Sequence, residues 1–204
     1  MPKDKTETHR KILPAAKKEF LEKGFEQASM RNIAAQVGMS AAGIYRHFTD
    51  KEAMFSALVD PVLKECDAWY EEHKKKDYEW LDENDLDAMW GAGADLEMML
   101  QLVYGHFDEF KLLLCCSEGT RYTGFLHDLV MLEQKETELF LEAAREKNIA
   151  VKEIDSGELH LLLSAYVSAL FEVVIHDFTE EKAVHYIKTL QSFFTPGWRA
   201  VLGL

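Results

Sequence analysis

Arg46 and Ser40 lie close together in a segment whose residue types suit the recognition of nucleic acid. The Arg46 guanidinium can reach a guanine edge or a phosphate, because its N–H donors form a planar fork. Ser40 precedes a short apolar segment, and with the free N–H groups of a helix start it offers further phosphate donors. These groups bind rather than catalyse, so the segment favours contact with DNA.

The charge of the chain is distributed in a way that permits such contact. The net charge is −13, yet residues 1–52 hold ten Lys or Arg against seven Asp or Glu, and the remainder holds 13 against 29. Because phosphate contacts need Lys and Arg, the amino-terminal part can approach DNA while the acidic remainder is held away.

Two short helices must position these groups, and we predict them at about residues 30–37 and 41–48, with Ser29 and Ser40 as N-caps. Helices that cross steeply need a small residue where they meet, a turn residue free to adopt positive φ, and apolar residues that lock them together. Those positions are filled by Ala34, by Gly38, and by Ile33, Val37, Met39 and Ile44. The spacing predicts a helix-turn-helix; the alternative is a chance pair of amphipathic helices with a glycine loop.

From Ile12 to Phe55 the sequence closely resembles the tetracycline-repressor-like (TetR) family of bacterial regulators. The resemblance is carried by Ile12-Leu-Pro-Ala-Ala16, Phe20 to Gly24, Ile33-Ala-Ala-Gln-Val-Gly-Met-Ser40, Ile44-Tyr-Arg-His-Phe48 and Lys51-Glu52. The remaining three quarters match only in length, helicity and the closing Gly197-Trp198. The resemblance implies a dimeric, ligand-responsive repressor that binds a palindromic operator in double-stranded DNA.

The family places the helix that begins at Ser40 in the major groove, so Ala41 and Ala42 would face base edges and touch thymine methyl groups. Tyr45 and His47 match positions that bind phosphate in the family. Lys51, and Arg31 at the start of the preceding helix, would brace the DNA backbone on either side.

Gly43 departs from the family pattern, which usually has Thr at this position. The change removes a hydroxyl contact to DNA and costs the recognition helix about 1 kcal/mol of intrinsic propensity, although closer backbone approach can compensate. Three neighbours have alternative roles. Tyr45 and Phe48 could be simple core aromatics, which is the expected role for Phe48, and His47 could be merely a capped surface residue.

Apolar residues recur at spacings of three and four through most of the chain, which predicts an all-α protein without strands. We expect a first helix at about residues 8–23, stopped by Gly24, and a fourth that opens with a Thr49–Glu52 capping box and kinks at Pro61. The polar segment 73–87 is predicted to be a loop. Further helices are expected at about residues 86–104, 106–116, 120–147, 157–177 and 180–194, with a short one from Pro196.

These elements predict two domains. Residues 1–52 would form a three-helix DNA-binding head with the helix-turn-helix, and residues 53–204 a larger helical domain for ligand binding and dimerisation. In the family, two late helices from each subunit pack as a four-helix bundle. The helix at 157–177 is apolar on nearly all sides, which supports burial against a partner; a deep monomer core is the alternative. Its face of mostly small residues comprises Leu161, Ser164, Ala165, Ser168 and Ala169.

A stretch between the fourth helix and that bundle is rich in bulky, adaptable side chains followed by polar groups, as a small-molecule sensor needs. We expect a lipophilic effector and a pocket drawn from Trp90, Met98, Met99, Leu102, Phe107, Phe110, Glu118, Arg121, Tyr122, Phe125 and His127. The competing interpretation is that most of these residues are ordinary core.

Other functional classes find less support in the sequence. Cys115, Cys116 and His127 invite a metal-sensor or redox-sensor interpretation, but adjacent helical residues point about 100° apart and cannot easily chelate one ion. We find no glycine-rich phosphate loop, nucleophile elbow or His-rich metal motif, so we expect neither an enzyme nor a cofactor. A ligand-independent DNA-binding protein is a further alternative. The charged amino terminus lacks a signal peptide, and we expect a cytoplasmic protein without a membrane segment.

Overall fold

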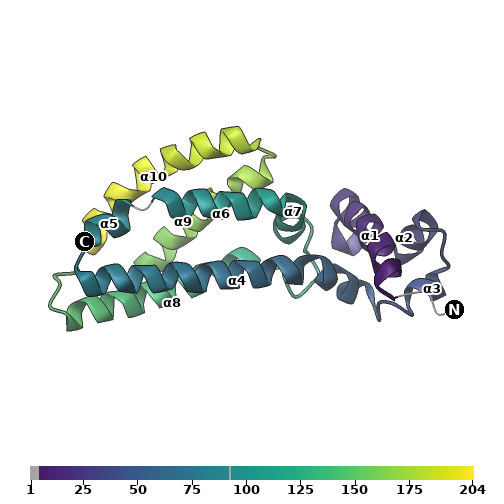
Figure 1. Cartoon of the computed structure of the whole chain (residues 1–204), viewed down its shortest axis with the longest axis horizontal. Helices are drawn as coiled ribbons and strands as arrows, with labels where there is room; N and C mark the ends of the chain where they lie inside the picture. The colour runs from purple at the N-terminus through teal and green to yellow at the C-terminus, as the bar shows by residue number, and fades with distance from the viewer. Residues whose placement is uncertain (1–4, 92) are drawn as a thin grey trace. The chain divides into compact units, whose positions relative to one another are not determined.

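The computed structural model describes residues 5–91 and 93–204, and within these ranges it contains helices and no strand. The all-α prediction is therefore confirmed. The helices are α1 (Lys5–Gln27), α2 (Met30–Gln36), α3 (Ala41–Ile44), α4 (Lys51–Glu83), α5 (Leu86–Gly91), α6 (Gly93–Gly105), α7 (Phe107–Cys115), α8 (Phe125–Glu146), α9 (Ser156–Ile175) and α10 (Glu180–Leu202), as labelled in Figure 1.

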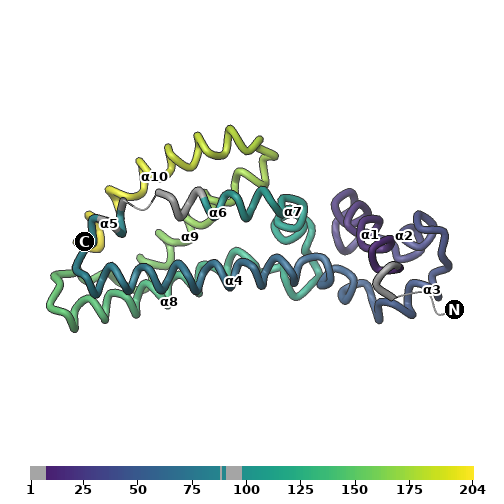
Figure 2. The backbone as a smooth tube through the Cα atoms, in the orientation of Figure 1, coloured from purple at the N-terminus to yellow at the C-terminus, as the bar shows by residue number. Residues whose placement is uncertain are grey.

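The chain divides into two compact units, which we call the head and the body. The head consists of the residues up to Cys66 together with His106–Thr123, and the body consists of Asp67–Gly105 and Gly124–Leu204. Helix α4 is one continuous tube in Figure 2. Its residues up to Cys66 belong to the head, and those from Asp67 belong to the body.

The head is built on an apolar core that α1 shares with α4. Ile12, Ala16 and Phe20 are fully buried, and the ring of Phe20 packs edge-on against Phe55 of α4 at 5.2 Å between centroids. Gly24 interrupts the helical geometry of α1 with φ of +71° and ψ of 165°. A glycine adopts this backbone readily, so the predicted helix stop at this residue is confirmed.

The predicted start of α4 is wrong by two residues, and so is its cap. The helix begins at Lys51, and the Asp50 carboxylate accepts a hydrogen bond from the backbone N–H of Ala53 at 2.7 Å. Thr49 instead donates its hydroxyl to Asp50. Asp is the stronger N-cap residue, and because it caps the helix the Glu52 carboxylate remains available for another partner.

The predicted loop at residues 73–87 is also wrong, because α4 continues to Glu83 and a turn at Asn84 leads directly into α5. The segment contains no Gly or Pro, and its Lys and Glu residues are good helix formers. Its charges pair along the helix, as in Lys75–Glu79 and Lys76–Glu72 at 3.5 Å each. Leu81 turns inward and is buried.

The helix α7 packs against α1, although the two stretches of the head are separated by about 40 residues of the body. Lys17 of α1 forms an ion pair with Glu109 of α7 at 2.6 Å. The backbone N–H of Phe25 donates to the carbonyl of Cys116 at 2.9 Å. The head is therefore assembled from two separate stretches of sequence.

In the body, α9 packs against α8 and α10, and α10 also packs against α6. The second half of α4 and α8 lie side by side (Figure 1) and run in the same direction. Three successive contacts join the two helices: Lys74–Glu136, Tyr78–Phe140 and Asp82–Lys147.

Three predicted helix boundaries in the body differ from the structure. Helix α10 continues through Pro196 to Leu202, so no separate terminal helix starts there. Helix α8 begins at Phe125 rather than near 120. The helix expected at 86–104 is divided into α5 and α6, and Ala92 between them lies outside the described residues.

By length and composition alone, helix α9 is long and apolar enough to cross a membrane, with a mean hydropathy of 1.6. One such helix is weak evidence, because the core helix of a globular domain passes the same test. Leu159, Leu163 and Val167 of α9 are buried within the body.

Candidate DNA-binding site and its support

The helix α3 and the turn after it present the predicted DNA-contacting residues at the surface of the head. Ser40 caps α3 by accepting a hydrogen bond from the backbone N–H of Gly43 at 3.1 Å, as predicted. Ala42 and Arg46 are exposed, and the Tyr45 side chain is 51% exposed. A polar aromatic and a guanidinium at the end of a capped helix are suitable groups for a phosphate or a base edge.

The helix α2 packs against α3 and supports it. Ser29 caps α2 by accepting from the N–H of Asn32 at 3.5 Å, and Gly38 between the helices has a φ of +67°, as the predicted turn requires. The Ile44 side chain is fully buried, which fixes α3 against the core. Arg31 is exposed in the first turn of α2.

His47 and Phe48 differ from their neighbours because their rings meet another part of the head. Phe48 is buried, as predicted, and its ring stacks on His9 of α1 at 4.7 Å. His47 is half-buried, with its ring edge-on to that of His9 at 5.5 Å.

Gly43 has ordinary helical geometry, so its small size rather than its backbone freedom is what distinguishes it. A Cβ atom at this position would lie 3.3 Å from Cε of Met39 and 3.4 Å from Oγ of Ser40. The Met39 contact is with the flexible end of a side chain, which can move by a few tenths of an ångström.

Lys51, a predicted phosphate contact, is held within the head by the end of α1. Its ammonium donates to the carbonyls of Glu26 and Ala28 at 2.9 and 3.2 Å, and it lies 4.5 Å from the centre of the Phe25 ring. These contacts join the first turn of α4 to the segment that precedes α2. The role of Lys51 toward phosphate stays a prediction.

Glu19 is a structural residue of the head that the sequence reasoning missed. Its side chain is only 4% exposed, and one carboxylate oxygen accepts from the backbone N–H of Ser29 and from Nδ2 of Asn32, at 3.2 and 3.1 Å. The other oxygen accepts from Nε2 of Gln36 at 3.3 Å. A buried carboxylate with three donors fixes α2 to α1. The available signal was a charged residue on the apolar side of the first helix.

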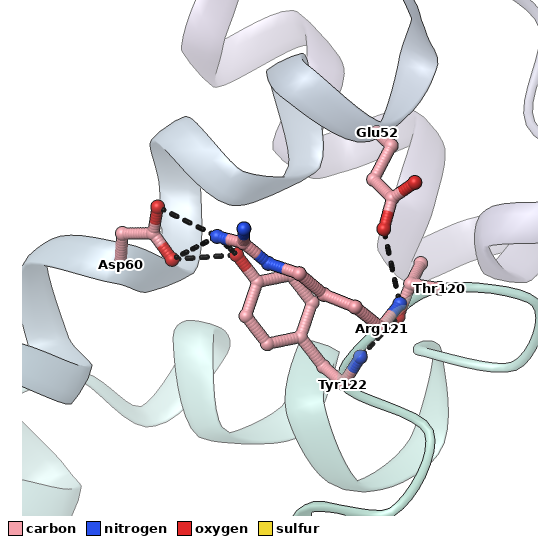
Figure 3. Close-up of polar contacts among 5 residues, drawn as sticks. All are labelled: Glu52, Asp60, Thr120, Arg121 and Tyr122. Atoms are coloured by element: carbon pink, nitrogen blue, oxygen red, sulfur yellow. Dashed lines mark hydrogen bonds and ion pairs between the residues drawn. The ribbon is translucent and has the colours of Figure 1, made fainter.

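A polar cluster ties α4 to the loop after α7, and Figure 3 shows its members. The Arg121 guanidinium lies 3.0 and 3.1 Å from the two Asp60 oxygens, and the Tyr122 hydroxyl donates to Asp60 at 2.5 Å. The backbone N–H of Arg121 donates to the Glu52 carboxylate at 3.0 Å. Burial and the hydrogen bond to Asp60 raise the pKa of Tyr122. The polar groups of Arg121 and Tyr122, predicted to meet a ligand, thus have partners within the head.

The predicted ligand-binding residues are divided between the two units. Phe107, Phe110, Glu118, Arg121 and Tyr122 belong to the head, whereas Trp90, Met98, Met99, Leu102, Phe125 and His127 belong to the body. Within the body, the Trp90 indole nitrogen is buried and has no hydrogen-bond partner among the described residues.

The predicted dimer residues lie on α9, and three of the five are exposed. Leu161 is 69% exposed, Ala165 and Ser168 are also exposed, and Ser164 and Ala169 are half-buried. On the neighbouring helix α10, Phe193 is 75% exposed.

The cysteines form no metal cluster: no group of three or more His, Cys, Asp or Glu in the described residues could hold an ion.

Comparison with known proteins finds similarity to one family in the amino-terminal segment. Residues 12–58 match the model for bacterial regulatory proteins of the tetR family. The HTH-type transcriptional repressor Rv1474c of Mycobacterium tuberculosis is 43% identical over 49 residues, which are 24% of this chain and 26% of that protein. The chain therefore spans about a quarter of the length of that relative. The uncharacterized HTH-type transcriptional regulator YfiR of Bacillus subtilis is 25% identical over 90% of this chain and 82% of its own.

Two solved structures share the whole fold. NalD, the secondary repressor of the MexAB-OprM multidrug efflux pump in Pseudomonas aeruginosa, matches with a TM-score of 0.59 at 20% identity over 91% of this chain and 94% of its own. The TetR-family regulator PfmR of Thermus thermophilus matches with a TM-score of 0.57 at 22% identity over 89% and 97%. The helix-turn-helix segment at residues 12–58 is thus similar to the tetR family of bacterial regulatory proteins, and the all-α fold agrees with that of the two solved regulators.

Proposed function

We propose that the protein is a cytoplasmic transcriptional repressor that binds a palindromic operator as a homodimer and is released from it by a small lipophilic molecule. The observation that carries this proposal is the capped, exposed recognition helix α3 in a segment that matches the tetR family model. The mycobacterial relative, which is similar over 49 residues, is a repressor by name.

The proposed DNA face consists of the N-terminal end of α3, the turn that follows it and the start of α2. Ala41, Ala42 and Gly43 are small enough for close approach to base edges, while Arg46 can read guanine or bind phosphate. Phosphate contacts are assigned to Ser40, Tyr45, His47 and Arg31. Tyr45, Arg46 and Arg31 are exposed, which supports this assignment.

A second copy of the chain is the proposed occupant of the exposed face of α9 and α10. From Leu159 to Phe171 and from Thr189 to Trp198 the sequence carries no Asp, Glu, Lys or Arg, in a chain of net charge −13. Leu161 and Phe193 are the most exposed large apolar side chains among the described residues. An uncharged, apolar face on two packed helices favours a self-complementary interface.

The proposed effector site lies in the body. Its Trp90 indole N–H is buried without a partner among the described residues, which is unfavourable unless an acceptor reaches it. The half-buried Met99 and Leu102 are apolar side chains of the kind that line permissive binding sites.

The proposal is tested on the intact chain with the promoter DNA of its own gene. We expect a dimer in sedimentation at micromolar concentration and a sequence-specific complex with a palindrome whose half-sites lie about 34 to 36 Å apart. Replacing Arg46 by Ala should weaken binding by about 1 to 3 kcal/mol at one operator position if Arg46 reads guanine, and equally on every sequence if it binds phosphate. A monomer without sequence-specific binding would refute the proposal.

A further inference from the structure

His9, near the start of α1, lies against the segment that follows the recognition helix α3. Its ring stacks on the ring of Phe48, at 4.7 Å between centroids and an interplanar angle of 25°. The same ring lies edge-on to that of His47, at 5.5 Å between centroids and an interplanar angle of 73°. Two imidazoles that are far apart in sequence are therefore neighbours within the head.

The contacts of His9 hold its ring and leave its polar edge without a protein partner. Phe48 is buried, and it supplies an apolar surface for one face of the half-buried imidazole. Among the described residues, no hydrogen bond and no ion pair involves the His9 imidazole. A histidine carries at least one N–H donor in either charge state, so His9 holds a donor in a restricted position. An apolar ring would cover Phe48 equally well.

Exposed arginines adjoin both imidazoles. Arg10 follows His9 along α1, Arg46 precedes His47 in the turn after α3, and both arginine side chains are exposed. The acidic residue that ends this segment, Asp50, accepts a hydrogen bond from the backbone at the start of α4. Two N–H donors between two cations favour the approach of an anion.

We propose that His9 is a further DNA-contacting residue, which together with His47 binds one phosphate of the operator backbone. This inference rests on the proposed function and deepens it, because it adds a residue of α1 to a DNA face drawn from α2, α3 and the turn after α3. A backbone phosphate has two non-bridging oxygens, one for each imidazole N–H. Stacking on Phe48 restricts the His9 donor before DNA binds, which reduces the entropy lost in forming the contact.

The test neutralises one operator phosphate at a time. A methylphosphonate linkage keeps the DNA backbone in place, but it lacks the negative charge and one acceptor oxygen. Binding of the intact protein to each modified duplex is compared with binding to the unmodified operator by fluorescence anisotropy. For the wild type, we expect a loss of about tenfold at the phosphate that His9 and His47 share.

His9→Phe separates the proposed contact from a purely structural role, because phenylalanine can still stack on Phe48 but has no N–H donor. We expect His9→Phe to bind the unmodified operator about tenfold more weakly than the wild type. Neutralising the shared phosphate should then cost this variant less than about twofold, while the other phosphates keep their effect. His47→Phe should lose its sensitivity at the same phosphate.

Two more variants guard this result. His9→Ala lacks the ring altogether and should show the same insensitivity at the shared phosphate, so the result does not depend on how a new ring packs. His185→Phe, at an exposed position of α10 in the body, is the matched control and should bind every duplex as the wild type does.

An unchanged operator affinity of His9→Phe would overturn the proposal. So would a weaker affinity with an unchanged phosphate profile, or a profile in which His9 and His47 respond to different phosphates. A wild type that binds no operator sequence-specifically refutes the proposed function and this inference with it, whereas operator binding that does not depend on His9 refutes this inference alone.

Discussion

Removing the Lys51 ammonium tests most directly how α4 is attached to α1 in the head. Lys51→Met keeps most of the aliphatic stem and removes two hydrogen bonds to carbonyls, at 2.9 and 3.2 Å, and a contact with the Phe25 ring at 4.5 Å. Each hydrogen bond contributes about 1 kcal/mol net, and the cation–π contact about 0.5 kcal/mol at a partly exposed position. We expect the free energy of unfolding to fall by about 2 to 3 kcal/mol.

The assay is urea unfolding of the full chain, and Lys18→Met is the matched control. Lys18 is exposed on α1 and lies 3.9 Å from Glu22, so its loss should cost less than about 0.5 kcal/mol. If Lys51→Met is no less stable than Lys18→Met, the inference that Lys51 ties α4 to α1 is wrong. Whether Lys51 also binds phosphate is a separate question, which the salt dependence of operator binding answers. Each lost phosphate contact reduces the steepness of the plot of log binding constant against log salt concentration by about 0.9.

Three further substitutions have defined outcomes in the same unfolding assay. Glu19→Gln places an amide donor against the groups that now donate to the carboxylate, and should cost about 1 to 3 kcal/mol; an unchanged stability would contradict that network. Gly43→Ala should stabilise the head by about 0.5 kcal/mol, because the Met39 side chain can yield and alanine favours helix; a loss would show that Met39 cannot move. Burial and the charges of Asp77 and Glu136 raise the pKa of Glu133 in α8 to about 7. Ionised Glu133 is therefore destabilising, so stability should fall as pH rises from 4.5 through 7, and Glu133→Gln should gain about 2 kcal/mol on the wild type between pH 5 and pH 8. A difference that does not vary with pH would contradict the raised pKa of Glu133.

Local features of the head were predictable because they depend on residues near in sequence. Ser29 and Ser40 cap the two helices, and Gly24 and Gly38 adopt positive φ, each for a reason visible within four residues. The family resemblance from Ile12 to Phe55 follows from the same short-range pattern.

Features that depend on distant or competing partners were not predictable. Thr49 and Asp50 are both good cap residues, and only the structure shows that Asp50 binds the helix start while Glu52 reaches Arg121. The charged segment after His73 looked like a loop because its stability depends on pairs along the helix and on contact with α8. Proximity of Arg121 to Asp60 joins residues 61 positions apart, which no local pattern reveals.

The interleaving of the head has a consequence for how the protein is made and how it can be recombined. A ribosome releases residues up to Cys66 well before His106–Thr123 emerge, so the first stretch of the head, and all of α4, are synthesised before the last helix of the head. During that interval the partners of Phe25 and Phe55 in the loop after α7, including the Tyr122 ring 5.8 Å from Phe55, are missing. A chimaera that exchanges only the amino-terminal residues would pack them against an α7 segment from a different protein. Exchange of DNA specificity between such regulators therefore calls for both segments to be transplanted together.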